Sequence, residues 1–215
     1  MSTIQINSHD QALREEFVAK GKVLYARGLA SGSAGNMSVM QSDGNIIVTP
    51  TGTCLGNLLS DSLSIVDIEG NLIDGPKPTK EAKFHAAVMR CNPEIKAIVH
   101  LHSTYATALA CLDNLDPENV IKPFTPYVVM KMGKIAMIPY YKPGSPKIAE
   151  DLAAKAKGHK AWLLANHGCV VGGKNLTEAV NNAEELEATA KLYFTLLPCQ
   201  DHIRYLTDTE VQELL

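Results

Sequence analysis

Apolar residues recur along this chain with two different spacings, which divide it into helical and extended segments. Three segments carry apolar residues every three or four positions and are predicted to be helices, namely 8–27, 79–91 and 177–197. Shorter helices are expected after residues 103, 145 and 209. Short apolar or alternating runs predict strands; these are 37–40, 46–48, 63–68, 71–73, 97–102, 138–141 and 161–168, with 170–173 continuing the last one past a turn.

The connections between these segments indicate one domain. Ser42-Asp43-Gly44-Asn45 and Glu69-Gly70 are typical of hairpin turns, so residues 37–73 are predicted to form an antiparallel meander. Residues 113–136 have no regular pattern and are expected to be a loop. Because helices flank the strands and the chain has 215 residues, we expect a single α/β domain over residues 1–215.

The amino-acid composition limits which classes of binding partner are expected. Charged residues make up 20% of the chain and the net charge is −3, so neither a nucleic acid nor a membrane surface is an expected partner. An anionic small molecule stays open, because local positive groups matter more than the total. The N-terminus lacks the basic and apolar segments of a signal peptide, and five scattered cysteines fit reduced thiols. A cytoplasmic protein is therefore expected.

Three histidines at apolar strands are candidate metal ligands. His100 and His102 are two positions apart in a predicted strand and so point to the same face, and His167 ends another apolar run. Three imidazoles with one open position are typical of a catalytic metal site. The alternative is that these are unrelated, half-buried structural histidines. Glu81, at the start of a predicted helix, is the carboxylate expected beside these histidines. The alternative is a surface anion that the helix dipole stabilises at that position.

Two loops rich in small and hydroxyl residues precede these histidines. Residues 29–38 contain Gly, Ser and Asn, and Thr49-Pro50-Thr51-Gly52 forms a second bend. Small residues let backbone N–H groups approach an anion such as phosphate. The alternative is an ordinary flexible loop. Cys169 follows His167 by two positions and is read either as a neighbour of the site or as a small buried residue.

Five ordered motifs resemble the class II aldolase/adducin family over almost the whole chain. They are Gly35-Asn36-Met37-Ser38, Thr49-Pro50-Thr51-Gly52, the segment 78–85 with the pattern Pro-Thr-x-Glu-x-x-x-His, His100-Leu101-His102 and Asn166-His167-Gly168. The resemblance implies an α/β/α sandwich around a mixed, mainly antiparallel sheet, assembled as a homotetramer with sites at subunit boundaries.

The resemblance also implies roles for individual residues. Zinc, or another divalent metal such as manganese, is expected on His100, His102 and His167, with Glu81 both as a further metal-side ligand and as the acid/base. His85, one helical turn after Glu81, is expected to support the site or to pack rather than to bind the metal. Phosphate is expected against the loops that carry the remaining matches, which are Asn36, Thr51, Gly52, Thr79 and Lys80.

Finer features separate subgroups of the family. Sugar-phosphate aldolases usually have Ser-Ser-Glu where this chain has Thr79-Lys80-Glu81. The segments 100–104, 125–127 and 140–144 are similar to those of decarboxylases that act on 3-oxo-tetronate 4-phosphates. Lys80 would suit a substrate that carries a carboxylate as well as a phosphate; otherwise it is a solvated lysine. Tyr127 is either a donor to a neighbouring subunit's site or a packed loop tyrosine.

The resemblance therefore implies a carbon–carbon lyase that acts on a phosphorylated acid sugar. The expected reaction converts a 3-oxo-tetronate 4-phosphate to dihydroxyacetone phosphate and carbon dioxide. Two alternatives remain, a fuculose- or ribulose-phosphate type aldolase and a non-enzymatic, adducin-like module.

Overall fold

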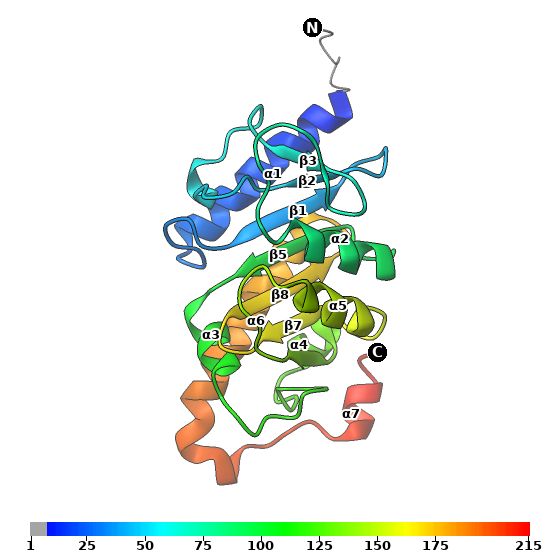
Figure 1. The fold of residues 1–215 in the computed structure, drawn as a ribbon. Helices are drawn as coiled ribbons and strands as arrows, with labels where there is room; N and C mark the ends of the chain where they lie inside the picture. The colour runs from blue at the N-terminus through cyan, green and yellow to red at the C-terminus, as the bar shows by residue number, and fades with distance from the viewer. Residues whose placement is uncertain (1–7) are drawn as a thin grey trace, which may run out of the picture.

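A single eight-stranded sheet organises the computed structural model, which describes residues 8–215 (Figure 1). The strand order is β4-β3-β2-β1-β5-β8-β7-β6. Only β6 and β7 run parallel, and every other neighbouring pair is antiparallel. The strands are β1 Asn36–Met40, β2 Ile46–Val48, β3 Ser64–Val66, β4 Leu72–Asp74, β5 Ala97–Leu101, β6 Ile135–Ile138, β7 Ala161–Leu164 and β8 Gly168–Gly173.

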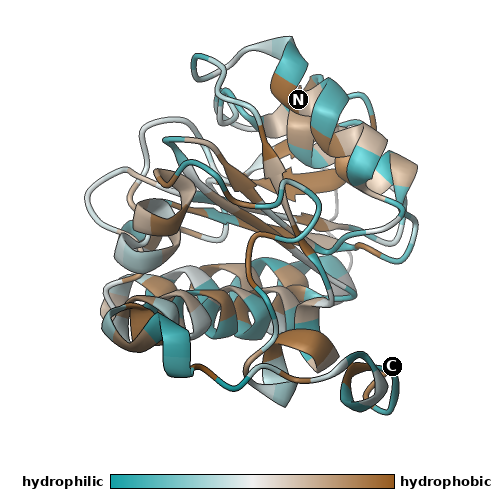
Figure 2. Cartoon of the chain, turned by 90° about the horizontal axis from the view of Figure 1, so that it is seen from below, coloured by the Kyte–Doolittle hydropathy of each residue, from teal (hydrophilic) through white to brown (hydrophobic). Residues whose placement is uncertain are grey.

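Helices cover both faces of this sheet. One face carries α2 and α5, whereas α1, α3, α4 and α6 pack on the other, and each face has its own hydrophobic core. Figure 2 shows mainly apolar strands between helices of mixed character. The helices are α1 Ser8–Ala26, α2 Ala82–Cys91, α3 Thr104–Ala110, α4 Pro126–Met132, α5 Pro146–Lys155, α6 Leu176–Leu196 and α7 Asp208–Gln212, with 3-10 turns η1 Leu55–Asn57 and η2 Leu197–His202. The expected sandwich around a mixed, mainly antiparallel sheet is confirmed.

Strand β5 shows how the sheet serves both cores. Its side chains alternate, so that Ala97, Val99 and Leu101 enter the core beneath α6, while Ile98 enters the core beneath α2. His100 therefore points to the α2 face. All five residues of the strand are buried. The antiparallel meander predicted for residues 37–73 is confirmed, and it pairs with β5 through β1.

Two expectations for the middle of the chain were wrong. Residues 126–132, expected within a loop, form α4, because Pro126 occupies the first helical position and Val128, Val129 and Met132 are buried. The strand expected at 138–141 is instead β6, Ile135–Ile138. Strand β6 ends before residue 139, a proline that cannot donate a hydrogen bond to a neighbouring strand.

The run 161–168 was also expected to be one strand, and it is a hairpin. Strand β7 ends at Leu164, and Asn166 adopts a positive φ of 55° before β8 begins at Gly168. His167 therefore lies in the turn rather than at the end of a strand. Asparagine tolerates this left-handed conformation better than most residues, which is the local reason for the reversal.

Nothing is described for residues 1–7, on which the expectation about a signal peptide depends. Within residues 8–215, every helix is too short or too polar to span a lipid bilayer.

Candidate metal centre

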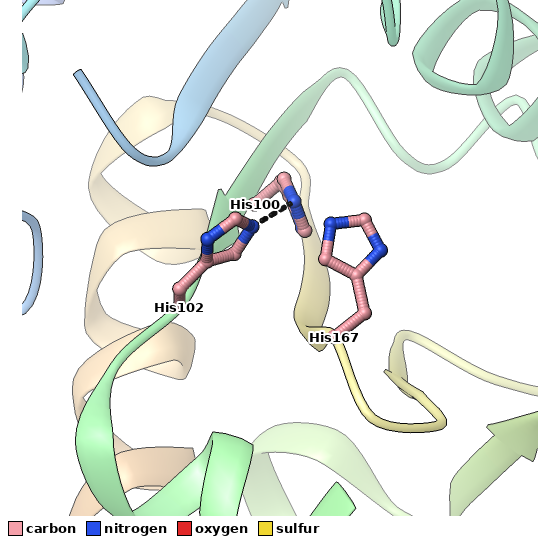
Figure 3. Close-up of side chains that lie close together, drawn as sticks. All are labelled: His100, His102 and His167. Atoms are coloured by element: carbon pink, nitrogen blue, oxygen red, sulfur yellow. Dashed lines mark hydrogen bonds between the residues drawn. The ribbon is translucent and has the colours of Figure 1, made fainter. Parts of the chain in front are cut away.

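The three candidate histidines meet on the α2 side of the sheet (Figure 3). His100 is the fourth residue of β5, His102 follows the end of that strand, and His167 comes from the turn between β7 and β8. Their ligand atoms all lie within 4.8 Å of one another. The Nε2 atoms of His100 and His102 are 3.0 Å apart. The side chains therefore converge on one point, as the two-residue spacing predicted.

Close backbone packing brings the third histidine to the pair. Strand β8 pairs with β5, with Cys169 opposite Leu101. A Cβ atom on Gly168 would lie 2.3 Å from the Leu101 carbonyl oxygen and 2.9 Å from Cδ2 of His102. Only glycine fits there, so Gly168 allows the turn that carries His167 to lie against the His102 segment.

Helix α3 fixes the chain directly after His102. Glu187 of α6 accepts hydrogen bonds from the backbone N–H groups of Tyr105 and Ala106, at 2.9 and 2.8 Å, and from the Ser103 hydroxyl at 2.7 Å. A carboxylate from another helix thus satisfies the first N–H groups of α3. The segment that holds His102 is anchored on both sides, by β5 and by this cap.

The hydrogen bonds of His100 set which nitrogen faces the cluster. Its Nδ1 lies 2.8 Å from the carbonyl oxygen of Cys169, which can only accept, so Nδ1 carries the hydrogen and Nε2 presents its lone pair. Burial, followed by the nearby His100, lowers the pKa of His102 to about 4. Neutral imidazoles are the form that binds metals.

Glu81 lies beside the three histidines. Its Oε2 is 3.3 Å from Nε2 of His100, and its Oε1 is 3.6 Å from Nε2 of His167. The residue occupies the N-cap position of α2, but its side chain makes no capping bond. Burial raises the pKa of the Glu81 carboxyl, but His100, the hydrogen bond from Asn36 and His167 together outweigh that effect and lower the pKa. The site therefore combines an ionised carboxylate with three imidazoles.

A cavity of about 270 Å³ opens in front of these groups. It brings together most of the candidate residues, namely Asn36, Thr51, Gly52, Thr79, Lys80, Glu81, His102 and His167, and Ser33, Pro143 and Gly144 also line it. His100 is fully buried behind it. Residues 143 and 144 come from the segment before α5, which carried no signal for the site apart from its place in the sequence resemblance.

Two candidates differ in placement from what their expected roles suggest. The side-chain amide of Asn36, expected to face phosphate, donates to Glu81 and accepts from His85, at 2.7 Å in both cases. Tyr127 lies on α4, is 59% exposed and does not line the cavity of its own chain. Asn36 thus supports Glu81, and Tyr127 faces outward.

Cys169 contributes through its backbone rather than its thiol. Its side chain is buried, and burial raises the pKa of the thiol to about 12, so it is a weak nucleophile and a poor ligand. The reading of Cys169 as a small buried residue is confirmed, and its carbonyl is the partner of His100.

The donor set fits a divalent metal. Three imidazole nitrogens, one buried in β5 and two at the wall of the cavity, leave a coordination position that the adjacent Glu81 carboxylate or an entering ligand can occupy. A closed structural site would occupy all four positions of a tetrahedral ion with tightly bound side chains. The arrangement instead leaves room for a ligand that enters from the cavity.

Comparisons with known proteins agree with this geometry. Residues 15–194 match the family Class II Aldolase and Adducin N-terminal domain. A 3-oxo-tetronate 4-phosphate decarboxylase of Haemophilus influenzae is 60% identical over 205 residues, which cover 95% of this chain and 97% of that protein. An L-fuculose phosphate aldolase of Methanococcus maripaludis is 38% identical, covering 84% of this chain and 96% of its own length. The crystal structure of YgbL from Klebsiella pneumoniae superimposes with a TM-score of 0.93 at 56% identity, covering 97% of this chain and all of that one.

Proposed function

The chain belongs to the class II aldolase and adducin family, and from that premise we propose that it is a 3-oxo-tetronate 4-phosphate decarboxylase. The reaction breaks the bond between the carboxyl carbon and its neighbour, releases carbon dioxide and leaves dihydroxyacetone phosphate after protonation. The identity of 60% to a relative of that name supports the choice of substrate.

The observation that carries the proposal is the position of Glu81 beside three converging histidines. A 3-oxo acid loses carbon dioxide when the electrons left behind are stabilised and the resulting carbanion is then protonated. His100, His102 and His167 would hold a divalent metal, which supplies the positive charge that stabilises those electrons. Glu81, which is ionised at rest, would take a proton from a water molecule in the cavity and then give it to the carbon, because it is the carboxylate that lines the same cavity.

The far side of the cavity suits the phosphate and carboxylate groups of the substrate. Thr51 and Thr79 bring hydroxyl groups to the cavity and Gly52 brings a backbone N–H, whereas the backbone N–H groups of the two threonines donate to carbonyl oxygens within the protein. Gly52 has a positive φ of 73° that glycine adopts without strain. Lys80 is exposed at the edge of the cavity and can reach an anionic group. Asn36 also lines the cavity, and its amide donates one hydrogen bond to Glu81 and accepts one from His85.

Further parts of the proposal concern the whole protein. We assign zinc as the metal, with manganese as the main alternative, because imidazole nitrogens are common zinc ligands and three of them beside an open position are typical of catalytic zinc sites. Residues 1–215 would form one domain, and four copies would assemble in the cytoplasm. The outward position of Tyr127 on α4 is compatible with a role at a neighbouring subunit's site.

Carbon dioxide release is the test of this activity. The purified protein is mixed with 3-oxo-tetronate 4-phosphate, generated in place from its alcohol precursor, before and after treatment with a chelator. We expect carbon dioxide and dihydroxyacetone phosphate in equal amounts, loss of both after chelation, and recovery when zinc or manganese is added back. Metal content measured on the same samples shows whether activity follows occupancy.

An aldolase is the second candidate, favoured by the identity of 38% to an L-fuculose phosphate aldolase. Both reactions leave the same three-carbon phosphate fragment, so one site can serve either by changing the group that departs. Release of an aldehyde from a phosphorylated ketose, without carbon dioxide from the oxo acid, would establish the aldolase. A protein that carries no metal and shows neither activity would instead fit a module without catalysis.

A further inference from the structure

A line of polar side chains leads from Glu81 into the interior between β1 and α2. Asn36 Nδ2 lies 2.7 Å from Oε2 of Glu81, Asn36 Oδ1 lies 2.7 Å from Nε2 of His85, and Nδ1 of His85 lies 2.6 Å from the Ser38 hydroxyl. Asn36 is 7% exposed, and His85 and Ser38 are fully buried. The four side chains thus form one continuous chain of hydrogen bonds.

Regular structure places these residues in register. Asn36 and Ser38 are two positions apart on β1 and share a face of the sheet, while His85 is four positions after Glu81, one helical turn along. The His85 ring also stacks on Phe84, with centroids 4.7 Å apart. The ring is therefore held on several sides, and its two nitrogens are both bonded.

The carboxylate determines the direction of every bond in the chain. An ionised carboxylate only accepts, so Asn36 must donate to it through Nδ2 and accept through Oδ1. His85 must then donate through Nε2. A neutral ring accepts at Nδ1, so the hydroxyl of Ser38 donates there. Burial lowers the pKa of His85 to about 3, which is consistent with a neutral ring.

We propose that Ser38, His85 and Asn36 act as positioning residues that fix the Glu81 carboxylate, with Ser38 and His85 acting only through Asn36. Their role in catalysis rests on the proposed function, because it concerns the group that protonates the substrate carbon. Each bond fixes the next one, so Asn36 cannot turn its amide over and present oxygen to Glu81. Since Oε2 accepts from Asn36, the other oxygen, Oε1, lies outside this chain of bonds, 3.6 Å from Nε2 of His167, and we assign the proton transfer to it.

Burying these four hydrogen-bonded side chains costs desolvation free energy, and a purely structural role does not explain why the protein accepts it. A buried hydroxyl, imidazole and amide lose their contacts with water, and each must be satisfied inside the protein. Apolar side chains between β1 and α2 would fill the same space without that requirement, as Ile98 and Val88 do nearby in the same core. The chain is complete from Ser38 to Glu81, so its effect is to orient that carboxylate.

The first test determines which ring nitrogen of His85 carries the hydrogen, and it needs no substrate. In protein labelled with ¹⁵N-histidine, two-bond ¹H–¹⁵N correlations report which ring nitrogen is protonated, and the His85→Gln variant identifies the His85 signals. We expect hydrogen on Nε2 and a bare Nδ1. Hydrogen on Nδ1 would reverse the deduced bonds and overturn the proposal, whatever reaction the protein catalyses.

The second test separates positioning from packing. His85→Leu removes the donor to Asn36, whereas the side-chain amide of His85→Gln can donate from nearly the place of Nε2. We expect kcat to fall about tenfold to a hundredfold in the leucine variant, with KM and metal content unchanged, and to recover most of this in the glutamine variant.

Met89→Ala is the matched control, because Met89 is buried one turn further along α2 and takes no part in the chain of hydrogen bonds. It should lower thermal stability without lowering kcat. Equal kcat values for the leucine and glutamine variants, or a loss of activity that follows metal loss, would overturn the positioning role. If wild-type protein releases no carbon dioxide, the proposed function fails, and the result on the His85 hydrogen still stands.

Discussion

At the scale of single residues, the candidate site depends on neighbours that form hydrogen bonds with the candidate metal ligands and with Glu81. His100 is fixed by the carbonyl of Cys169, and Glu81 by the amide of Asn36. These partners determine which atoms remain free. Nε2 of His100 is turned toward the other candidate ligands, 3.0 Å from Nε2 of His102, and Oε1 of Glu81 lies 3.6 Å from Nε2 of His167. Hydrogen bonds within the protein therefore orient both of these side chains of the candidate site.

Replacing Glu81 by glutamine is expected to keep the metal and to remove turnover. The substitution preserves shape and the acceptor for Asn36 but removes the acid, so kcat should fall about a hundredfold to ten-thousandfold. Stopped assays of carbon dioxide release and metal analysis of the same preparation measure both properties. Glu94→Gln, at an exposed position outside the cavity, should change neither. A Glu81→Gln protein that purifies without metal would make Glu81 a necessary ligand rather than an acid.

The sequence predicted which residues come together around the cavity, but not their hydrogen-bond partners. Short motifs picked out the three histidines, Glu81 and the loops around the cavity, and the structure places these residues side by side. The bond from Asn36 to Glu81 depends on how β1 lies beside α2, which no spacing within one segment specifies. For the same reason, the contacts of Asn36 with Glu81 and His85 could not be predicted from the sequence.

At the scale of elements, strand alternation and glycine packing place the ligands. Strand β5 presents His100 on the α2 face, and β8 lies against it closely enough to bring His167 within reach. Alternating and helical patterns predicted most of these elements, including the meander and the long helix α6. They failed where a residue type is compatible with more than one local structure. Pro126 begins a helix instead of marking a loop, and Asn166 turns the chain between two strands.

Gly168→Ala is expected to damage both stability and the metal centre. The added Cβ would meet the Leu101 carbonyl and the His102 ring, and such overpacking typically costs about 1–3 kcal/mol. Urea unfolding of the metal-free protein and calorimetric zinc titration measure the two effects.

Gly158→Ala provides the comparison for Gly168→Ala, since a Cβ at Gly158 meets nothing within 4 Å. It should leave zinc affinity unchanged. Normal zinc binding by Gly168→Ala would show that the close contact between β5 and β8 does not position the histidines.

At the scale of the whole molecule, one sheet lies between two hydrophobic cores, and its strands contribute side chains to both. The meander and the β5–β8–β7–β6 half are parts of the same ladder, joined where β1 pairs with β5. The candidate site lies at that junction, because Asn36 is on β1 and His100 is opposite it on β5. Disturbance of either half should therefore reach the site.

Unfolding is expected to be a single transition for the whole chain. Trp162 is the only tryptophan and is fully buried in β7, on the half of the sheet away from the meander. Its fluorescence should change at the same urea concentration as the far-ultraviolet circular dichroism, which averages over all elements. Two separated midpoints, at constant protein concentration, would divide the chain into two domains and contradict the single-domain proposal.

The separation of the histidines along the sequence has a consequence for how long the folded protein lasts. His102 and His167 come from distant segments, so an ion held between them would tie two strands together in the manner of a chemical cross-link. Such an ion binds the folded chain and not the unfolded one, so each tenfold rise of free ion above its dissociation constant adds about 1.4 kcal/mol to the free energy of unfolding. The concentration of free metal in the cell would then affect how fast the protein unfolds and is degraded, as well as its catalysis.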